Sequence, residues 1–352
     1  MTSCSEDPKE LLNQAQTEIF KHQYINYKPM GFYPNPIGKI DTLKALTFFR
    51  KNNKSVIGYD FLIKNKHSDM LYIQEVLKEV DHRNRNVNLF PKKELYKEKS
   101  TIENNRFIKY SPLKLLNEID WNYASDTIIE KERLRNFYRL EVDTIIDGNK
   151  IYTEQHIFLN PKSKLLVRFE RRNYYNGQPT QKVVFKYEDY NFDDSAKGLP
   201  YNYPLNYKSV VYGKEKSKPL LDVGKKTPLF SGKDLHNKLF NLKDYIGKKI
   251  VLNFSVINCG YSLEAFKHFN RNDYQLSKDI TMIYINPHDK KNDIVEYVNK
   301  LNLPFSVIPN AKEIEEAYGV SSYPTFFQID EKGIIEKVKI GYDEEFLDSF
   351  KK

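Results

Sequence analysis

The sequence predicts an α+β protein of two domains, in which an antiparallel sheet with helices is followed by a separate α/β domain. Its 352 residues exceed the usual size of a single domain. Between residues 56 and 190, apolar and polar residues alternate between turn signals, as in antiparallel strands. From residue 223 onward, continuous apolar runs alternate with helical patterns, as in a sheet that is covered on both faces.

The composition supports packed cores and narrows the classes of function. Hydrophobic residues make up 40% and aromatic residues 14% of the chain, which excludes a mainly disordered protein. The net charge of +9 comes from mixed charges of both signs, and no basic run with interleaved aromatics predicts nucleic-acid binding. No spacing of Cys and His predicts a metal site, and no motif predicts a cofactor. No stretch of about 18 apolar residues predicts a transmembrane helix.

The first 20 residues are expected to form a tail and a short amphipathic helix over 9–20. Thr2-Ser3-Cys4, followed by a polar and acidic stretch, resembles the end of a bacterial lipoprotein box. This resemblance implies that Cys4 carries a lipid, which would hold the protein at a membrane surface without spanning it. The alternative is an ordinary exposed cysteine in a frayed terminus.

Residues 21–212 are expected to form a β-rich domain. A helix over 41–51 follows the turn-rich segment around Pro29 and Pro34. Turn signals such as Asp147-Gly148 and Asn176-Gly177 join the later strands and predict an antiparallel meander. The strands are expected at 56–63, 69–76, 139–146, 150–159, 165–175 and 181–190, with an edge strand near 207–212 in the connector that covers 192–222.

One run in this domain, His156–Glu170, carries a family resemblance. In it a strand ends in the turn Asn160-Pro161-Lys162, and the next strand begins with apolar and basic residues. The run resembles the lipoprotein-binding, half-barrel domains of the LolA type, over about residues 55–195. The resemblance implies a concave, half-barrel-like sheet with helices against it, which could hold an apolar ligand. The alternative is that the aromatic side chains fill the core of the domain itself.

Residues 223–352 are expected to form the α/β domain. A continuous apolar strand at 250–257 leads directly into Cys259 and a helix. The order of elements, with parallel central strands and a terminal hairpin, is that of a thioredoxin fold. The remaining elements are helices at 263–270, 291–301 and 314–318 and strands at 280–285, 325–329 and 334–340.

Several short motifs in residues 223–343 occur in the order and spacing of one family. They resemble those of the TlpA-like, membrane-attached thiol-disulfide oxidoreductases, and the resemblance rests on their combination. The motifs are Gly224-Lys225-Lys226-Thr227-Pro228, Asn241–Lys248, Leu252-Asn253-Phe254, Cys259-Gly260, Tyr318-Gly319-Val320, Tyr323-Pro324-Thr325 and Asp330–Gly333.

Cys259 is the candidate catalytic residue. It lies where a buried strand meets the start of a helix, and the helix dipole and free N–H groups at such a position stabilise a thiolate. The resemblance implies that Pro324 is cis and that the backbone of Tyr323 binds an extended substrate beside the cysteine. Gly260 and Tyr261 complete this predicted binding site, whose partners would be protein thiols or disulfides.

The departures from the family pattern limit the chemistry. Asn258 replaces the Trp of the Trp-Cys-x-x-Cys motif, and Ser262 replaces its second cysteine. Asn253 stands where thioredoxins have a buried carboxylate, and Lys267 where the family often has a proline. Because no resolving thiol lies three residues after Cys259, the ordinary dithiol reductase cycle is not expected.

Three functions remain open. Cys259 can act as a monothiol whose adduct is resolved by an external thiol, with Ser262 donating a hydrogen bond to the thiolate. Alternatively, the fold is a degenerate one that binds a partner, lipid or lipoprotein without turnover. A peroxidase is disfavoured, because Val256 and Leu252 stand where peroxiredoxins have Thr or Ser and Pro.

Two further residues are expected near the site. His288 should approach its edge from the loop after the second strand, as a solvated residue. Glu264 is interpreted as complementing the helix dipole in the first turn. Together with the lipoprotein-like start, the family resemblance predicts a location in the bacterial cell envelope.

Overall fold

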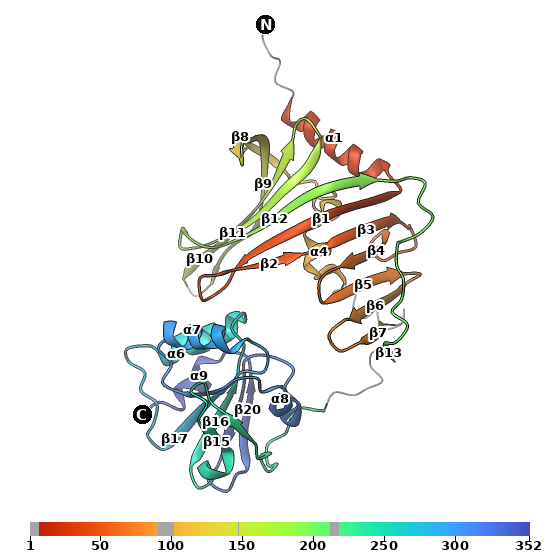
Figure 1. Ribbon diagram of the computed structural model, residues 1–352. Helices are drawn as coiled ribbons and strands as arrows, with labels where there is room; N and C mark the ends of the chain where they lie inside the picture. The colour runs from red at the N-terminus through yellow and green to blue at the C-terminus, as the bar shows by residue number, and fades with distance from the viewer. Residues whose placement is uncertain (1–6, 91–101, 147, 212–217) are drawn as a thin grey trace. The chain divides into compact units, whose positions relative to one another are not determined.

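The computed structural model describes residues 7–90, 102–146, 148–211 and 218–352. The chain forms two compact units, and the change from one to the other falls between residues 211 and 218 (Figure 1). The predicted lipidation site Cys4 lies outside the described residues. Every described helix is too short or too polar to cross a membrane.

The N-terminal unit is built on one 13-stranded sheet, with β1 between β3 and β12 and with β2 paired to β1. The strand order is β13-β7-β6-β5-β4-β3-β1-β12-β11-β10-β9-β8, and only β13 and β7 pair in parallel. The strands are β1 Tyr24–Pro34, β2 Ile40–Lys44, β3 Leu46–Lys51, β4 Tyr59–Lys64, β5 Ser68–Ile73, β6 Val76–Asp81, β7 Asn86–Phe90, β8 Asn122–Ile129, β9 Glu132–Ile146, β10 Asn149–Asn160, β11 Leu165–Tyr175, β12 Gln178–Phe192 and β13 Lys208–Val211.

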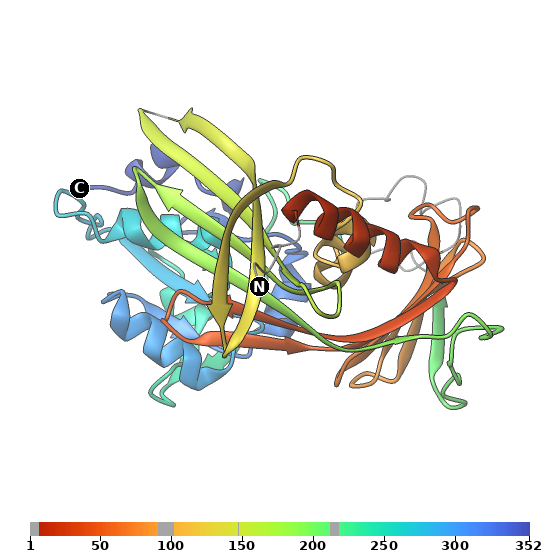
Figure 2. The same cartoon turned by 90° about the horizontal axis from the view of Figure 1, so that it is seen from above.

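The predicted antiparallel meander is confirmed, because β9, β10, β11 and β12 pair in sequence order. The predicted edge strand of the connector is also present as β13. The strands β8 and β13 at the two ends of the sheet do not pair with each other, so the sheet is open. Figure 2 shows that it curves around the side on which α1 lies.

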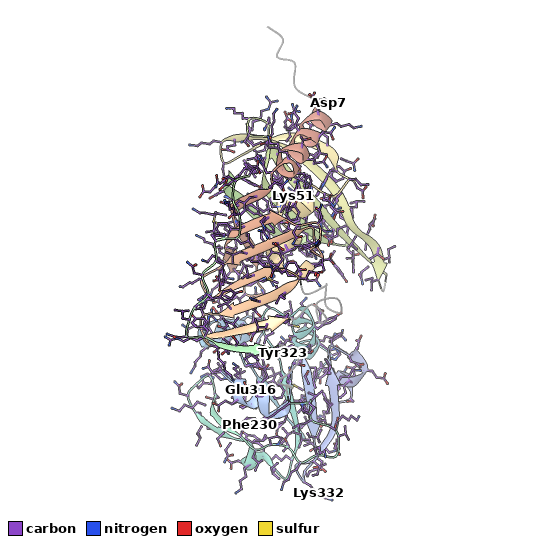
Figure 3. The ribbon with its side chains drawn as sticks, turned by 90° about the vertical axis from the view of Figure 1, so that its right-hand side faces the viewer. Asp7, Lys51, Phe230, Glu316, Tyr323 and Lys332 are labelled. Atoms are coloured by element: carbon purple, nitrogen blue, oxygen red, sulfur yellow. The ribbon has the colours of Figure 1, made fainter. Side chains whose placement is uncertain are left out.

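Of the helices in the described part of this unit, α1 Pro8–Lys21, α4 Arg106–Lys109 and α5 Pro112–Leu115 cover one face of the sheet. Helix α1 confirms the predicted amphipathic helix and buries Leu11, Ala15 and Ile19. Asp7, labelled in Figure 3, caps it by accepting a hydrogen bond from the Lys9 N–H at 2.9 Å. The buried aromatic residues of the strands and the helices share one core with these three side chains.

The predicted helix over 41–51 is wrong, since this segment forms β2 and β3. Thr47 and Phe49 are buried while their neighbours are less so, which is the two-residue period of a strand. The turn-rich segment before it is β1, which was missed because of Pro29. Pro29 lies where the partner of β1 changes from β3 to β2, and its carbonyl still accepts from the Ala45 N–H at 3.2 Å.

The C-terminal unit contains a five-stranded sheet in the order β18-β17-β16-β19-β20. Strands β16, β17 and β18 are parallel, while β19 and β20 are antiparallel to their neighbours. The strands are β16 Lys249–Phe254, β17 Ile280–Ile285, β18 Ser306–Ile308, β19 Thr325–Ile329 and β20 Ile335–Ile340, and the helices are α6 Gly260–Phe269, α7 Lys291–Lys300, α8 Lys312–Tyr318 and α9 Glu344–Asp348.

Strand β16 is buried on both faces, which explains its continuous apolar run. Val251 packs with Phe266 and Tyr297 from the helices on one face, while Leu252 packs with Tyr318 on the other. A short hairpin, β14 Ser231–Lys233 and β15 Leu239–Asn241, and the 3-10 helix η1 Leu242–Tyr245 precede β16. This sheet therefore fixes the loop after β16, where Cys259 lies.

Candidate active site at the start of helix α6

Cys259 is the residue that immediately precedes α6. Its carbonyl accepts the first helical hydrogen bond, from the Leu263 N–H at 3.0 Å, and its side chain makes no capping bond. The first turn, Gly260–Leu263, contains no carboxylate. The thiol is partly exposed. A thiolate at this position would therefore interact with the helix N-terminus without competition from an acidic side chain in the first turn.

The loop before β19 lies directly against this thiol. The Tyr323–Pro324 bond is cis, in agreement with the expectation from the family resemblance. The Cys259 Sγ–H donates to the Tyr323 carbonyl oxygen at 3.2 Å. Two segments that are 64 residues apart in the chain thus bring the Cys259 thiol and a backbone acceptor together.

The buried side of the helix start carries polar atoms without partners. Ser262 is fully buried, and its hydroxyl makes no hydrogen bond with any described residue. The predicted hydrogen bond from Ser262 to Cys259 is therefore not formed. Asn253 Oδ1 accepts from the Ser255 hydroxyl at 2.6 Å, but Asn253 Nδ2 has no partner in the described chain. Buried groups of this kind cost stability.

Tyr297 of α7 is a third such residue, and sequence reasoning missed it. Its hydroxyl is buried and has no partner among the described residues. Burial is the largest cause that raises the pKa of Tyr297, and the negative charges of Asp289 and Cys259 raise it further. The phenol therefore stays protonated within electrostatic reach of the cysteine.

Asp289, in the loop after β17, braces the segment before the cysteine. Its Oδ2 atom accepts from the Ile257 N–H and from Asn286 Nδ2, both at 2.8 Å. Asn286 Oδ1 in turn accepts from the Asp289 N–H at 2.9 Å. This network holds the backbone two residues before Cys259. The only sequence signal for this network was an Asp in the loop that follows a buried strand.

His288 lies at the edge of the site, as expected, but it is paired. Its Nε2 atom is 3.1 Å from the carboxylate of Glu315, a residue of α8 that is only 7% exposed. Burial raises the pKa of Glu315, and the neighbouring His288 opposes this shift. The His288 ring lies edge-on to the Tyr323 ring, with 6.1 Å between the ring centres. Sequence reasoning missed Glu315, although α8 leads directly into the Tyr323 loop.

The first two residues of α6, which follow the cysteine, are exposed. Tyr261 is 66% exposed and Gly260 is exposed, so both are accessible to a partner. Glu264 lies beyond the first turn and pairs with Lys267 at 2.8 Å. The expected placement of Glu264 in the first turn is therefore wrong, because α6 begins at Gly260.

A separate cavity of about 370 Å³ lies in the N-terminal unit, beside the end of α1, β3 and α5. Apolar side chains such as Phe20, Phe49 and Leu113 line it, together with the charged residues Lys51, Glu103, Lys109 and Lys114. Its volume is within the usual range for small-molecule sites.

Comparison with known proteins places the C-terminal unit in a family. The model of the AhpC/TSA family matches residues 223–338. The thioredoxin-like protein YneN of Bacillus subtilis (strain 168) is 26% identical over 121 residues, which are 34% of this chain and 71% of that protein. The thiol-disulfide oxidoreductase ResA of Bacillus thuringiensis subsp. konkukian (strain 97-27) is 30% identical over 136 residues, which are 38% of this chain and 78% of ResA.

Among solved structures, the putative thiol:disulfide interchange protein DsbE from Chlorobium tepidum is 24% identical, with a TM-score of 0.33. The match covers 37% of this chain and 92% of that one. The fold, the placement of Cys259 against the loop of Pro324 and the match to ResA agree with one another. The chain belongs to the thioredoxin-like thiol-disulfide oxidoreductases related to ResA and TlpA.

Proposed function

We propose that the C-terminal unit exchanges disulfides through Cys259 alone, as a monothiol oxidoreductase. The observation that carries this proposal is the partly exposed Cys259 Sγ, 3.2 Å from the Tyr323 carbonyl, with a buried serine where the family has its second cysteine. The nucleophile and its binding loop are present, whereas Ser262 cannot act as a resolving thiol.

The exchange needs one external thiol. The Cys259 thiolate attacks one sulfur of a substrate disulfide, a bond to Cys259 forms, and the second substrate sulfur leaves as a thiolate. The thiolate of the external thiol then attacks the substrate sulfur of this mixed disulfide. Cys259 leaves as a thiolate, and the substrate remains bonded to the external thiol. The number of disulfides is the same before and after the cycle.

The proposed substrates are protein thiols and disulfides presented in an extended segment. Formation of the Cys259 thiolate removes the hydrogen bond to the Tyr323 carbonyl, which frees this oxygen for a substrate N–H. The exposed ring of Tyr261 offers an apolar contact on the other side of the cysteine.

Intact-protein mass spectrometry with glutathione disulfide tests this proposal, in a Cys4→Ser background so that Cys259 is the only thiol. We expect one glutathione adduct, formed at least about tenfold faster at pH 7 than in the urea-unfolded chain. Cys259→Ser is the control that forms none. An adduct that forms no faster in the native protein than in the unfolded chain would contradict the proposal.

The second candidate for this site is peptide binding without turnover. Asn253 in place of a buried carboxylate favours it, because the amide cannot accept a proton from the thiol. In this case Cys259→Ala would bind an extended peptide as tightly as the wild type, and no native-state acceleration of the adduct would be seen.

For the N-terminal unit, we infer a LolA-like, half-barrel role in binding an amphiphile. The open, curved sheet with helices on one face supports this, and so does the cavity that combines apolar walls with lysine amines. Such a site suits an acyl chain with an anionic head. An envelope location with a lipid on Cys4 would bring the unit close to such molecules.

Native mass spectrometry and a fluorescent fatty acid test this second role. Exposed Lys109 lines the cavity, so Lys109→Glu should weaken binding several-fold without disturbing the core. Lys162→Glu, at an exposed turn outside the cavity, is the matched control. An equal effect of the two substitutions, or no saturable binding, would contradict the amphiphile site.

A further inference from the structure

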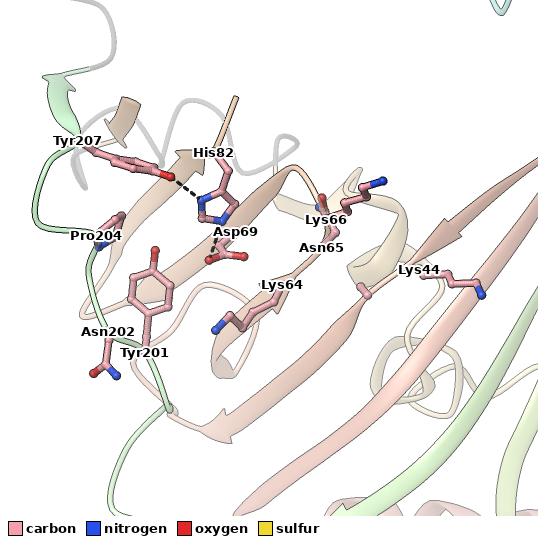
Figure 4. A pocket seen from close by; sticks show the side chains of 11 residues that line it. Lys44, Lys64, Asn65, Lys66, Asp69, His82, Tyr201, Asn202, Pro204 and Tyr207 are labelled. Carbon is pink, nitrogen blue, oxygen red and sulfur yellow. Dashed lines mark hydrogen bonds and ion pairs between the residues drawn. The ribbon is translucent and has the colours of Figure 1, made fainter. Parts of the chain in front are cut away.

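The N-terminal unit contains a second recess, a cleft of about 570 Å³ that none of the arguments above involves. The turn between β4 and β5 and the end of β2 form one side of it, and the connector residues 201–207 form the other (Figure 4). We call it the connector cleft. Its lining combines three lysines, one histidine and two tyrosines with a single carboxylate.

The cleft carries uncompensated positive charge. Lys44, Lys64 and Lys66 line it, and none of the three forms an ion pair with a carboxylate of the described chain. Many other lysines of the protein do, for example Lys150 with Asp143 at 3.2 Å. Three unpaired amines around one recess favour an anionic ligand.

The single carboxylate that lines the cleft is buried and paired with a histidine. Asp69 is 4% exposed, and its Oδ2 atom lies 3.1 Å from His82 Nε2. The other ring nitrogen of His82, Nδ1, lies 3.2 Å from the Tyr207 hydroxyl and forms a hydrogen bond with it. Figure 4 shows this chain of Asp69, His82 and Tyr207. It anchors the connector to the sheet and gives the one carboxylate of the lining a partner, whereas the three lysine amines have none among the carboxylates of the described chain.

Tyr201 supplies a donor that lacks an acceptor. Its hydroxyl oxygen is buried and has no partner among the described residues. Burial, followed by the charge of Asp69, raises the pKa of Tyr201 to about 12, so the hydroxyl keeps its proton at neutral pH. A buried donor without an acceptor is unfavourable, and an anionic oxygen of a ligand would accept the missing hydrogen bond. The Lys64 amine lies 5.8 Å from the centre of the same ring.

We propose that the connector cleft binds a phosphate group through Lys64, Lys66 and the Tyr201 hydroxyl, with Lys44 contributing charge. A phosphate offers several acceptor oxygens and up to two negative charges, which matches several amines and one O–H donor better than a single carboxylate does. The group belongs either to a soluble phosphate ester or to a phospholipid headgroup.

Calorimetric titration of the full chain with inorganic phosphate, at constant ionic strength, is the first arm of the test. Co-sedimentation with phosphatidylglycerol vesicles, against phosphatidylcholine vesicles, is the second. The variants are Lys64→Gln with Lys66→Gln, and Tyr201→Phe, which changes no charge. Lys9→Gln with Lys162→Gln removes two exposed, unpaired lysines outside the cleft and is the matched control.

We expect the double cleft variant to weaken binding at least tenfold, Tyr201→Phe to weaken it about threefold, and the control to change it less than twofold. A loss in the titration assigns the site to soluble phosphate, and a loss in the vesicle assay alone assigns it to a lipid headgroup. If neither arm shows binding, or if the cleft and control variants lose it equally, the proposal is wrong.

Discussion

The two sides of the start of helix α6 differ in how completely their polar groups are satisfied. On the exposed side, the Cys259 thiol meets the Tyr323 carbonyl, and Asp289 braces the preceding backbone. On the buried side, the hydroxyls of Ser262 and Tyr297 have no partner in the described structure. Under the proposed function, the half of the site that attacks and binds the substrate is thus complete, whereas the half that would resolve the mixed disulfide is not.

The largest expected effect comes from completing the buried half. Ser262→Cys places a second thiol three residues after Cys259, at a buried position whose hydroxyl makes no hydrogen bond that would be lost. We expect a gain in dithiothreitol-driven insulin reduction of at least about a hundredfold over the wild type, because the mixed disulfide can then be resolved internally. Ser262→Ala is the matched control and should show no gain.

The next effect comes from the end of α8, where the chain enters the loop that contains Tyr323. Gly319 ends α8 with a φ of +68°, and a Cβ atom there would lie 2.1 Å from the Pro219 carbonyl oxygen. Gly319→Ala should destabilise the C-terminal unit by about 3 kcal/mol or more. Gly341→Ala, at a φ of +85° in open space, should cost only about 1 kcal/mol. Calorimetric unfolding of both variants measures the difference, and equal costs would refute the assignment of a close backbone approach.

Two buried serines allow a direct comparison between a hydroxyl that has a hydrogen-bond partner and one that has none. Ser262→Ala removes an unpartnered hydroxyl and should stabilise the protein by about 1 kcal/mol. Ser255→Ala breaks the 2.6 Å bond to Asn253 Oδ1 and should destabilise it by about 1–2 kcal/mol. Urea unfolding followed by circular dichroism distinguishes the two signs. A loss of stability in Ser262→Ala would mean that its hydroxyl has a partner.

The smallest expected effect concerns Glu315. Burial raises its pKa in the folded state, so its folded form binds a proton more tightly than its unfolded form. Its contribution to stability is present below its unfolded pKa and is lost as pH rises through the folded value. Glu315→Gln should therefore gain stability relative to the wild type as the pH rises above the ordinary pKa of a glutamate. A difference that does not change with pH would contradict the shift.

Much of the C-terminal unit follows from local sequence patterns, because its strands are buried on both faces and its helices alternate with them. The meeting of Cys259 with the Tyr323 loop was implied by the family resemblance, whereas the position of Cys259 before α6 was predictable from these patterns. The pairings of Asp289 with Ile257 and of Glu315 with His288 were not. They join residues from loops and helices that only the tertiary structure brings together, and no local period encodes them.

The N-terminal sheet was less predictable at its beginning. Strand β1 contains Pro29 and Pro34, which favour a turn in any local interpretation. The strand nevertheless forms, because β1 changes its partner from β3 to β2 at Pro29. The N–H group that proline lacks therefore falls between the two sets of hydrogen bonds and interrupts neither. The long strands β9–β12 could be predicted, since paired turn signals separate them.

The fate of a preformed adduct tests the central claim most directly. With Cys4→Ser in place, Cys259 is loaded with glutathione, and its release is followed by intact mass before and after free glutathione is added. We predict that the adduct persists until the free thiol is added, whereas Ser262→Cys releases glutathione unaided and forms an internal disulfide. If the protein that retains Ser262 released glutathione unaided, at a rate comparable to that of Ser262→Cys, the proposed monothiol exchange would be contradicted.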